Sequence, residues 1–138
     1  MITNQELKDF KYHANIVKLK EMEIERLRSK AEQTSSSLTS AKAGNSSIIS
    51  RQERFVEQAE ELMKQLEEER LALNEREMKI RRFINSIDDE LTKAIFTYRS
   101  IYGYTWSKIA TTLYNNNSPD NLMKIYFRYL DKHYNDDV

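Results

Sequence analysis

Polar side chains able to contact nucleic acid gather between residues 118 and 133, opposite an apolar stripe. The stripe consists of Leu122, Ile125, Tyr129 and Leu130. The opposite side carries Asp120, Asn121, Lys124 and Arg128. Asparagine can hydrogen-bond adenine, and arginine or lysine can bind guanine or a phosphate. This spacing predicts a helix whose polar side reads base edges; the alternative is a row of ordinary solvent-facing charges.

Other groups around this helix could hold the phosphate backbone of a nucleic acid. Ser118 and the free amides at the helix start are suited to a phosphate. The remaining candidate backbone contacts are Lys108, Lys132, Lys79, Arg81 and Arg82. The last three form the one concentrated basic patch in the sequence. We therefore expect double-stranded DNA as a partner of the C-terminal part.

No other group of side chains predicts catalysis or metal binding. The chain has no cysteine, and His13 and His133 lie far apart without a ligand-spaced partner. Two acidic clusters occur, at 88–90 and 136–137. The first is interpreted as a helix start and the second as a chain end. Signatures of nucleotide, hydrolase or metalloprotease sites do not occur, so we expect a protein that is not an enzyme and carries no cofactor.

The candidate side chains are positioned by two short helices with a polar turn between them. In the first helix, 105–113, the apolar residues stand at i, i+3, i+4 and i+7, as Trp106, Ile109, Ala110 and Leu113. Three asparagines then break the pattern. Ser118 followed by Pro119 is a strong start signal for the second helix, 118–133, because the hydroxyl caps it and proline needs no N–H there. This order predicts a helix-turn-helix.

A further helix is expected immediately before this pair. An apolar face extends over 84–102, and the acidic run at 88–90 predicts a break near Asn85 or Ser86. Gly103 is expected to end this helix in the left-handed conformation, and Thr105 to cap the next. Residues 84–138 are thus predicted to form a trihelical helix-turn-helix domain.

Long helices are predicted for most of the preceding chain. Residues 1–33 form the N-terminal helix, because Phe10, Val17, Ile24 and Ala31 recur every seven residues. Residues 34–50 contain many serines, with Gly44, and are expected to form a flexible linker. Residues 51–83 then form a heptad coiled-coil helix, in which Glu69 and Arg76 fall within the apolar seam and could pair across helices.

A heptad helix of this length must bury its stripe against the first helix, a second copy, or both. The side chains expected to mediate oligomerisation are Ala59, Leu62, Leu66, Leu73 and Ile80. We therefore expect a homodimer or higher homo-oligomer. The predicted fold class is all-α, a long coiled-coil or helical hairpin followed by the C-terminal three-helix module.

Composition supports the helical prediction but says less about the partner. The 138 residues include 2 glycines, 1 proline and 32% charged residues, which favours helices over sheets. No apolar run is long enough to span a membrane and no signal peptide is recognised, so a soluble, cytoplasmic protein is expected. Residues 88–138 carry six Lys/Arg and seven Asp/Glu, a net charge of −1, so any DNA affinity must come from local patches.

The tyrosines cluster near the C-terminal end of the sequence, and they have two interpretations. Tyr98 and Tyr129 lie on apolar faces and are expected in the core. Tyr104, Tyr114 and Tyr126 could be core residues or could contact DNA or a protein partner, because tyrosine suits half-buried contact surfaces.

The order of these parts resembles small phage and prophage proteins of Gram-positive bacteria, the loose group of ArpU- and RinA-like phage transcriptional regulators. The C-terminal part is similar to the −35-reading domain of sigma factors. The best match is the pattern G-x-[ST]-W-x-x-I-A-x-x-L, here Gly103, Thr105, Trp106, Ile109, Ala110 and Leu113. Arg128 and Leu130 fit the end of its recognition helix. The turn from Tyr114 to Asn117 departs from that family because it is longer and has no glycine.

This resemblance implies sequence-specific DNA binding and control of phage late or packaging genes. Two other hypotheses stay open. One is an accessory protein that binds and modulates a host or phage protein, as an adaptor or inhibitor. The other is an architectural coiled coil that serves assembly or packaging.

Overall fold

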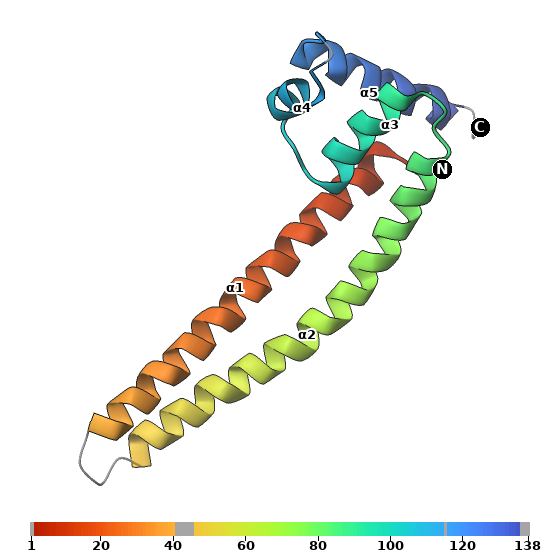
Figure 1. Ribbon diagram of the computed structural model, residues 1–138. Helices are drawn as coiled ribbons and strands as arrows, with labels where there is room; N and C mark the ends of the chain where they lie inside the picture. Colours follow the sequence, from red (N-terminus) through yellow and green to blue (C-terminus); the bar gives the residue numbers. More distant parts are fainter. Residues whose placement is uncertain (1, 41–45, 115, 136–138) are drawn as a thin grey trace. The chain divides into compact units, whose positions relative to one another are not determined.

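A computed structural model describes residues 2–40, 46–114 and 116–135, with side chains left out at 34–40, 46–49, 134 and 135. The elements, shown in Figure 1, are α1 (Asn4–Ser40), α2 (Ser46–Asn85), α3 (Glu90–Phe96), the π-helical segment η1 (Thr97–Ile101), α4 (Trp106–Leu113) and α5 (Pro119–Asn135). The described residues contain no strand, so the predicted all-α fold class is confirmed. The chain forms two compact units: unit 1 is Met1–His13 with Leu73–Val138, and unit 2 is Ala14–Ala72.

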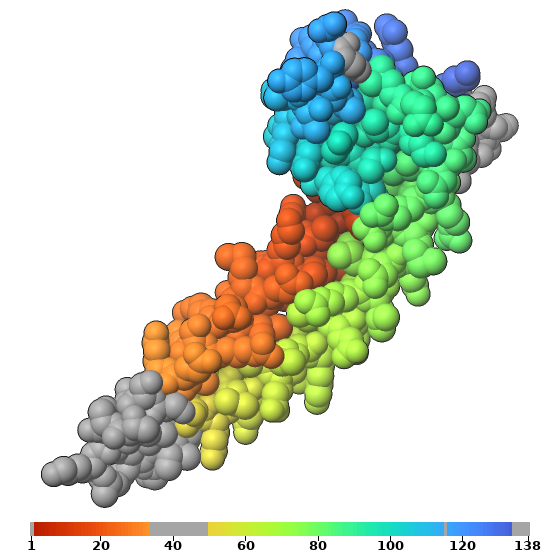
Figure 2. Space-filling model, viewed as in Figure 1, coloured from red at the N-terminus to blue at the C-terminus, as the bar shows by residue number. Residues whose placement is uncertain are grey.

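The core of unit 1 lies among α3, η1, α4 and α5. α5 packs against both α3 and α4, and η1 packs against the same two helices (Figure 1). The largest fully buried side chains are Phe96, Ile80, Ile95, Ile109 and Leu122. Phe96 is central, because its ring stacks on Tyr126 at 4.4 Å and meets Phe83 edge-on at 5.5 Å. The space-filling view shows α3, α4 and α5 packed as one continuous body (Figure 2).

The core of unit 1 extends beyond the predicted boundary at residue 84. Ile2, Leu7 and Phe10 from the start of the chain join it, as do Ile80 and Phe83 from the end of α2. The expected domain of 84–138 is therefore too short. The physical reason is size, because three short helices bury too little apolar surface, and both chain segments add to the same core.

The helix ends in unit 1 follow the sequence signals closely. α2 ends at Asn85, and the Asp89 carboxylate caps α3 by accepting hydrogen bonds from the amide and hydroxyl of Thr92, at 2.9 and 2.6 Å. These hydrogen bonds lower the pKa of Asp89. Thr105 caps α4 by accepting from the Lys108 amide. Both the break near Asn85 and the Thr105 cap are thus confirmed.

The predicted helix over 84–102 is interrupted in two ways. Residues 86–89 separate α2 from α3, and the helix then widens into η1, where the Tyr102 amide donates to the Thr97 carbonyl, five residues back. The Thr97 hydroxyl donates to the Lys93 carbonyl at 2.8 Å, a contact that competes with the backbone ladder. Gly103 has φ 69° and closes the segment in the left-handed conformation, as predicted.

Unit 2 consists of two antiparallel helical segments that lie side by side, one from α1 and one from α2 (Figure 1). Their seam buries Val17, Ile24, Leu27, Ala31, Ala59 and Leu66. Charged pairs join the helices along this seam. Lys20 pairs with Glu69, and Arg70 pairs with Glu21 at 2.7 Å. Of the two charges expected in the seam, Glu69 thus pairs across the helices, with Lys20 as its partner, whereas none of these ion pairs contains Arg76.

The predicted linker over 34–50 is wrong at both ends. α1 continues to Ser40 and α2 begins at Ser46, while residues 41–45 lie outside the described residues. Serine and threonine cost only a few tenths of a kcal/mol per residue relative to alanine. A helix that is already nucleated can therefore continue through them, because propagation adds one hydrogen bond for each residue fixed. The N-terminal helix, predicted for 1–33, thus ends later than predicted, and the heptad helix, predicted for 51–83, begins earlier and ends later.

The residues predicted to mediate oligomerisation pack within the single chain. Ala59 and Leu66 are buried in unit 2, Ile80 is buried in unit 1, and Leu62 and Leu73 are half-buried. The stripe is covered because the antiparallel segment of α1 supplies the partner that a second copy was expected to supply. These five side chains therefore need no second copy, whereas self-association itself stays a prediction.

Candidate nucleic-acid interface

The helix pair α4 and α5 carries most of the side chains that the sequence singled out. α4 packs on α5 through the fully buried Ile109 and Leu122. Trp106, Ala110 and Leu113 also pack against the core, as predicted, and all three are partly buried. Tyr126 and Leu130 anchor the same side of α5. One side of α5 is thus held rigidly, which leaves its other side to face solvent.

The exposed side of α5 displays a row of amide and cationic side chains, with the exposed carboxylate of Asp120 at its start. Asn121, Lys124, Arg128 and Lys132 are all exposed. Their spacing of three or four residues keeps them along one side of a helix. Within the described residues, no carboxylate lies in ion-pair distance of Lys124 or Arg128. The structure therefore brings together the predicted reading residues.

Local hydrogen bonds set the start of α5. Ser118 accepts the Asn121 amide at 3.1 Å, which makes it the N-cap. The side-chain amide of Asn121 donates to Asn117. Ser118 thus has a structural role independent of any phosphate, and Asn121 must exchange this partner if it binds a base.

The turn between the two helices uses left-handed residues other than glycine. Tyr114 has φ 53° and Asn116 has φ 65°, while Asn115 lies outside the described residues. Asparagine tolerates this conformation, whereas a bulky side chain such as tyrosine rarely adopts it. Tyr114 is 89% exposed. In this turn without glycine, a strained tyrosine thus adopts the left-handed conformation.

The basic patch of Lys79, Arg81 and Arg82 is partly neutralised by neighbouring carboxylates. Lys79 binds Glu6 at 2.8 Å, and Arg81 lies 3.6 Å from Glu77. Burial alone would raise the pKa of Glu6. The hydrogen bonds from Lys79 and from the Thr3 amide outweigh burial, so that the pKa falls below its ordinary value. Two of these three cations therefore have an established partner within the chain.

The sequence interpretation named Lys108 but missed that it belongs to a second group of cations. From Leu91 to Pro119 the chain contains Lys93, Arg99 and Lys108 but no Asp or Glu. The net charge of −1 over 88–138 concealed this stretch, since its carboxylates all lie outside it. The absence of acidic residues between 91 and 119 was visible in the sequence and could have identified it.

Aromatic rings hold two of these cations in place. The Lys108 Nζ lies 3.9 Å from the centre of the Tyr104 ring, and the Arg99 guanidinium lies 4.7 Å from the Trp106 ring. Arg99 also donates to the Tyr104 carbonyl at 3.0 Å. Tyr98 stacks on Tyr104 with centroids 5.2 Å apart. Lys108 was predicted as a backbone contact, whereas its aromatic support could not be read from the sequence.

The structure separates the tyrosines whose roles were left open. Tyr126 is a core residue, because it is buried and its hydroxyl lies 3.4 Å from the buried Ser100 hydroxyl. Burial raises the pKa of Tyr126 despite that contact and the nearby charge of Arg99. Tyr104 is half-buried at the edge of the core, whereas Tyr114 is exposed. Tyr129 lies at the core as predicted, in edge contact with Phe96 at 5.6 Å.

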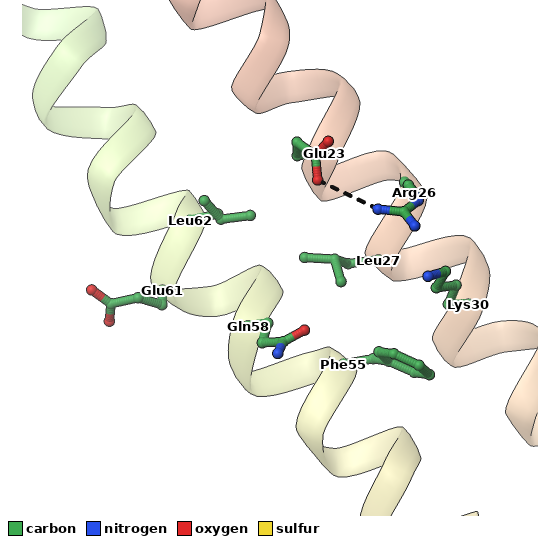
Figure 3. A pocket seen from close by; sticks show the side chains of 8 residues that line it. All are labelled: Glu23, Arg26, Leu27, Lys30, Phe55, Gln58, Glu61 and Leu62. Carbon is green, nitrogen blue, oxygen red and sulfur yellow. Dashed lines mark ion pairs between the residues drawn. The ribbon is translucent and has the colours of Figure 1, made fainter.

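Unit 2 contains an open groove of about 430 Å³ on one flank of its helix pair. Figure 3 shows Leu27 and Leu62 pointing toward one another from the two helices, with Phe55 and Gln58 beside them and Glu61 pointing away. Lys30 lies 5.7 Å from the Phe55 ring, and Glu23 pairs with Arg26 at the rim. The groove thus combines three apolar side chains, Leu27, Phe55 and Leu62, with polar and charged ones.

Comparisons with protein families, with curated proteins and with solved structures find no match for this chain. Within the described residues, no helix is both long and apolar enough to cross a membrane. In the same residues, no three His, Asp or Glu side chains are grouped so that they could hold a metal ion. Asp136 and Asp137, one of the acidic clusters, lie outside the described residues.

Proposed function

We propose that this chain is a cytoplasmic, phage-type transcriptional regulator that binds double-stranded DNA with α5 as its recognition helix. The observation that carries the proposal is the row of Asn121, Lys124, Arg128 and Lys132 on the exposed side of a helix whose other side is buried. A helix anchored in this way can enter the major groove, while the first helix of the pair crosses the backbone.

The proposed roles follow from the chemistry of each side chain. Asn121 is suited to adenine and Arg128 to guanine, while Lys124 can bind either a base or a phosphate. Lys132, at the far end of α5, is suited to the backbone. The resemblance to ArpU- and RinA-like regulators supports the same assignment, because its matched residues Trp106 and Ile109 lie where α4 supports α5.

Replacement of both reading cations tests the proposal directly. Lys124→Ala combined with Arg128→Ala should abolish the preference for DNA from upstream of the protein's own gene over unrelated DNA, because base-edge contacts carry specificity. Both side chains are exposed, so circular dichroism should show unchanged helix content and melting. The readout is the ratio of the two dissociation constants in electrophoretic mobility shifts.

A matched control removes the same charge elsewhere in unit 1. Lys8 and Lys11 are exposed cations on α1, and Lys8→Ala with Lys11→Ala should leave the sequence preference intact. If the α5 double variant keeps the preference of the unaltered protein, α5 is not the recognition helix.

Self-association is proposed as part of this function, on surfaces other than the predicted stripe. Leu19, Met22, Val56, Met63 and Leu71 are large apolar side chains of unit 2 that remain exposed. Large apolar side chains exposed to solvent can serve as protein–protein contacts, so these residues are equally compatible with the alternative of a protein-binding adaptor. Light scattering at micromolar concentration should give the mass of a dimer or larger; a monomer would contradict the homo-oligomer.

A further inference from the structure

The surface formed by η1, the following loop and the start of α4 carries cations and aromatic rings that the proposed role of α5 does not use. This surface lies within the one long stretch of unit 1 without acidic residues, from Leu91 to Pro119. Asp88, Asp89 and Glu90 precede it, and Asp120 follows it. Carboxylates repel phosphates, so a surface that lacks them while carrying fixed cations is suited to an anion with repeated charges.

The exposed cation of this surface, Lys108, is held by an aromatic ring. Its Nζ lies 3.9 Å from the centre of Tyr104, and Tyr104 is itself stacked on Tyr98 at an interplanar angle of 15°. A lysine normally loses considerable rotamer freedom on binding. A ring that already restricts the side chain reduces that cost, so that Lys108 is preorganised for an anion.

Arg99 fixes the loop that carries these rings. Its guanidinium lies over Trp106 and donates to the Tyr104 carbonyl at 3.0 Å. The π-helical turn of η1 and the left-handed Gly103 turn the chain back, so that the Tyr104 amide donates to the Tyr98 carbonyl at 3.0 Å. π-turns recur at functional sites. Arg99 therefore acts as a positioning residue for Tyr104 and Lys108.

Tyr102, which lies beside the rings of Tyr98 and Tyr104, faces solvent. Tyr102 is 59% exposed, with its centroid 6.3 Å from Tyr98 and 6.1 Å from Tyr104. A tyrosine fixed by neighbouring rings offers a flat apolar surface beside the cation. Sugars and bases of nucleic acids pack on such surfaces, while a neighbouring lysine binds the phosphate.

The same surface continues onto the proposed recognition helix. Trp106 contacts Phe127 of α5 with centroids 6.4 Å apart. Phe127 is itself partly exposed, and it lies three residues after Lys124 and directly before Arg128. The η1–α4 surface and α5 are thus joined through the contact of Trp106 with Phe127.

We propose that Lys108 and Tyr102 contact the sugar–phosphate backbone of duplex DNA, adjacent to the base pairs that α5 reads. Lys108 binds a phosphate oxygen, and the Tyr102 ring packs against the adjoining deoxyribose. This inference rests on the proposed function and adds to it a second contact surface, which supplies affinity independent of sequence.

The test compares the salt dependence of duplex binding for Lys108→Gln, Tyr102→Ala and a control, Lys8→Gln, in the full chain. Lys108→Gln should weaken binding equally for specific and unrelated duplexes, and it should reduce the slope of log K against log salt by about 1. Lys108→Arg should keep the slope. Tyr102→Ala should weaken binding at least about threefold with an unchanged slope, because it removes packing and no charge.

Three outcomes overturn the inference, and only the second of them is also a failure of the proposed function. If the unaltered protein binds and the α5 double variant loses its sequence preference, but Lys108→Gln and Tyr102→Ala bind like Lys8→Gln, only the η1–α4 contact is wrong. If the unaltered protein shows no duplex binding at low salt, the recognition helix and this surface fail together. Stronger binding of the same strands when unpaired would assign the surface to single-stranded DNA and contradict the duplex contact.

Discussion

At the scale of single residues, the cations of this chain differ in what surrounds them. Lys79 is bound to Glu6 and Lys20 to Glu69, whereas Lys108 rests on a tyrosine ring. Sequence spacing places a cation on a helix side, but it does not reveal which partner lies opposite, because that partner is 49 or more residues away in each ion pair named here. The sequence therefore did not show that carboxylates of the same chain partly neutralise the basic patch around Lys79.

The pair of Lys20 and Glu69 should contribute measurably to the stability of unit 2. Both side chains are mostly buried, with 23% and 28% of their surface exposed, and one Glu69 oxygen is buried without a hydrogen bond. Glu69→Gln should lower the free energy of unfolding by about 1–2 kcal/mol, because the mostly buried ammonium of Lys20 loses its charged partner. Urea unfolding followed by circular dichroism measures the loss.

The neighbouring Glu68 provides the control, since it is exposed on the same helix. Glu68→Gln should change the free energy of unfolding by less than about 0.5 kcal/mol. Equal unfolding midpoints for the two variants would show that the Lys20–Glu69 contact does not stabilise the folded chain.

At the scale of elements, the helix ends that depend on one or two strong signals were predictable. Thr105, Ser118 and Gly103 stand where the sequence placed them, because capping and left-handed geometry require particular residue types. The serine-rich region was mispredicted for the opposite reason: a run of weak preferences does not end a helix. The widened turn of η1 had no sequence signal that we recognised.

Gly103 offers a clean test of backbone conformation. A Cβ added there meets no atom within 4 Å, so any cost of substitution is conformational and not steric. Gly103→Ala should destabilise unit 1 by about 1–2 kcal/mol, since φ 69° disfavours alanine. Gly103→Asn should lose less, because asparagine tolerates that region. Thermal unfolding of both variants decides; an alanine variant as stable as the unaltered protein would contradict the left-handed helix end.

At the scale of the whole molecule, the sequence predicted helix type and apolar faces better than it predicted how the chain divides. Ile2, Leu7 and Phe10 belong to the core of the C-terminal helices, although Phe10 begins the heptad pattern that predicted an N-terminal helix alone. Periodicity identifies which side of a helix is buried, but not which segment covers it. The predicted oligomerisation stripe was reassigned for the same reason, since α1 covers it within one chain.

The net charge of the C-terminal part was misleading about DNA binding, whereas the distribution of charge along the sequence was informative. Residues 88–138 sum to −1, yet the 29 residues from 91 to 119 carry three cations and no carboxylate. Phosphate contacts act over about a Debye length, roughly 8–10 Å at physiological salt. The local distribution therefore matters more for DNA binding than the total.

The salt dependence of duplex binding tests the central claim most directly. The full chain is titrated into a labelled duplex from upstream of its own gene, and fluorescence anisotropy is followed at increasing potassium chloride. If Lys108 and Lys132 each neutralise one phosphate, log K should fall linearly with log salt, with a slope of about −1.8, or of about −2.7 if Lys124 also binds a phosphate. Absence of binding at low salt, or an affinity that does not change with salt, would contradict DNA binding by this module.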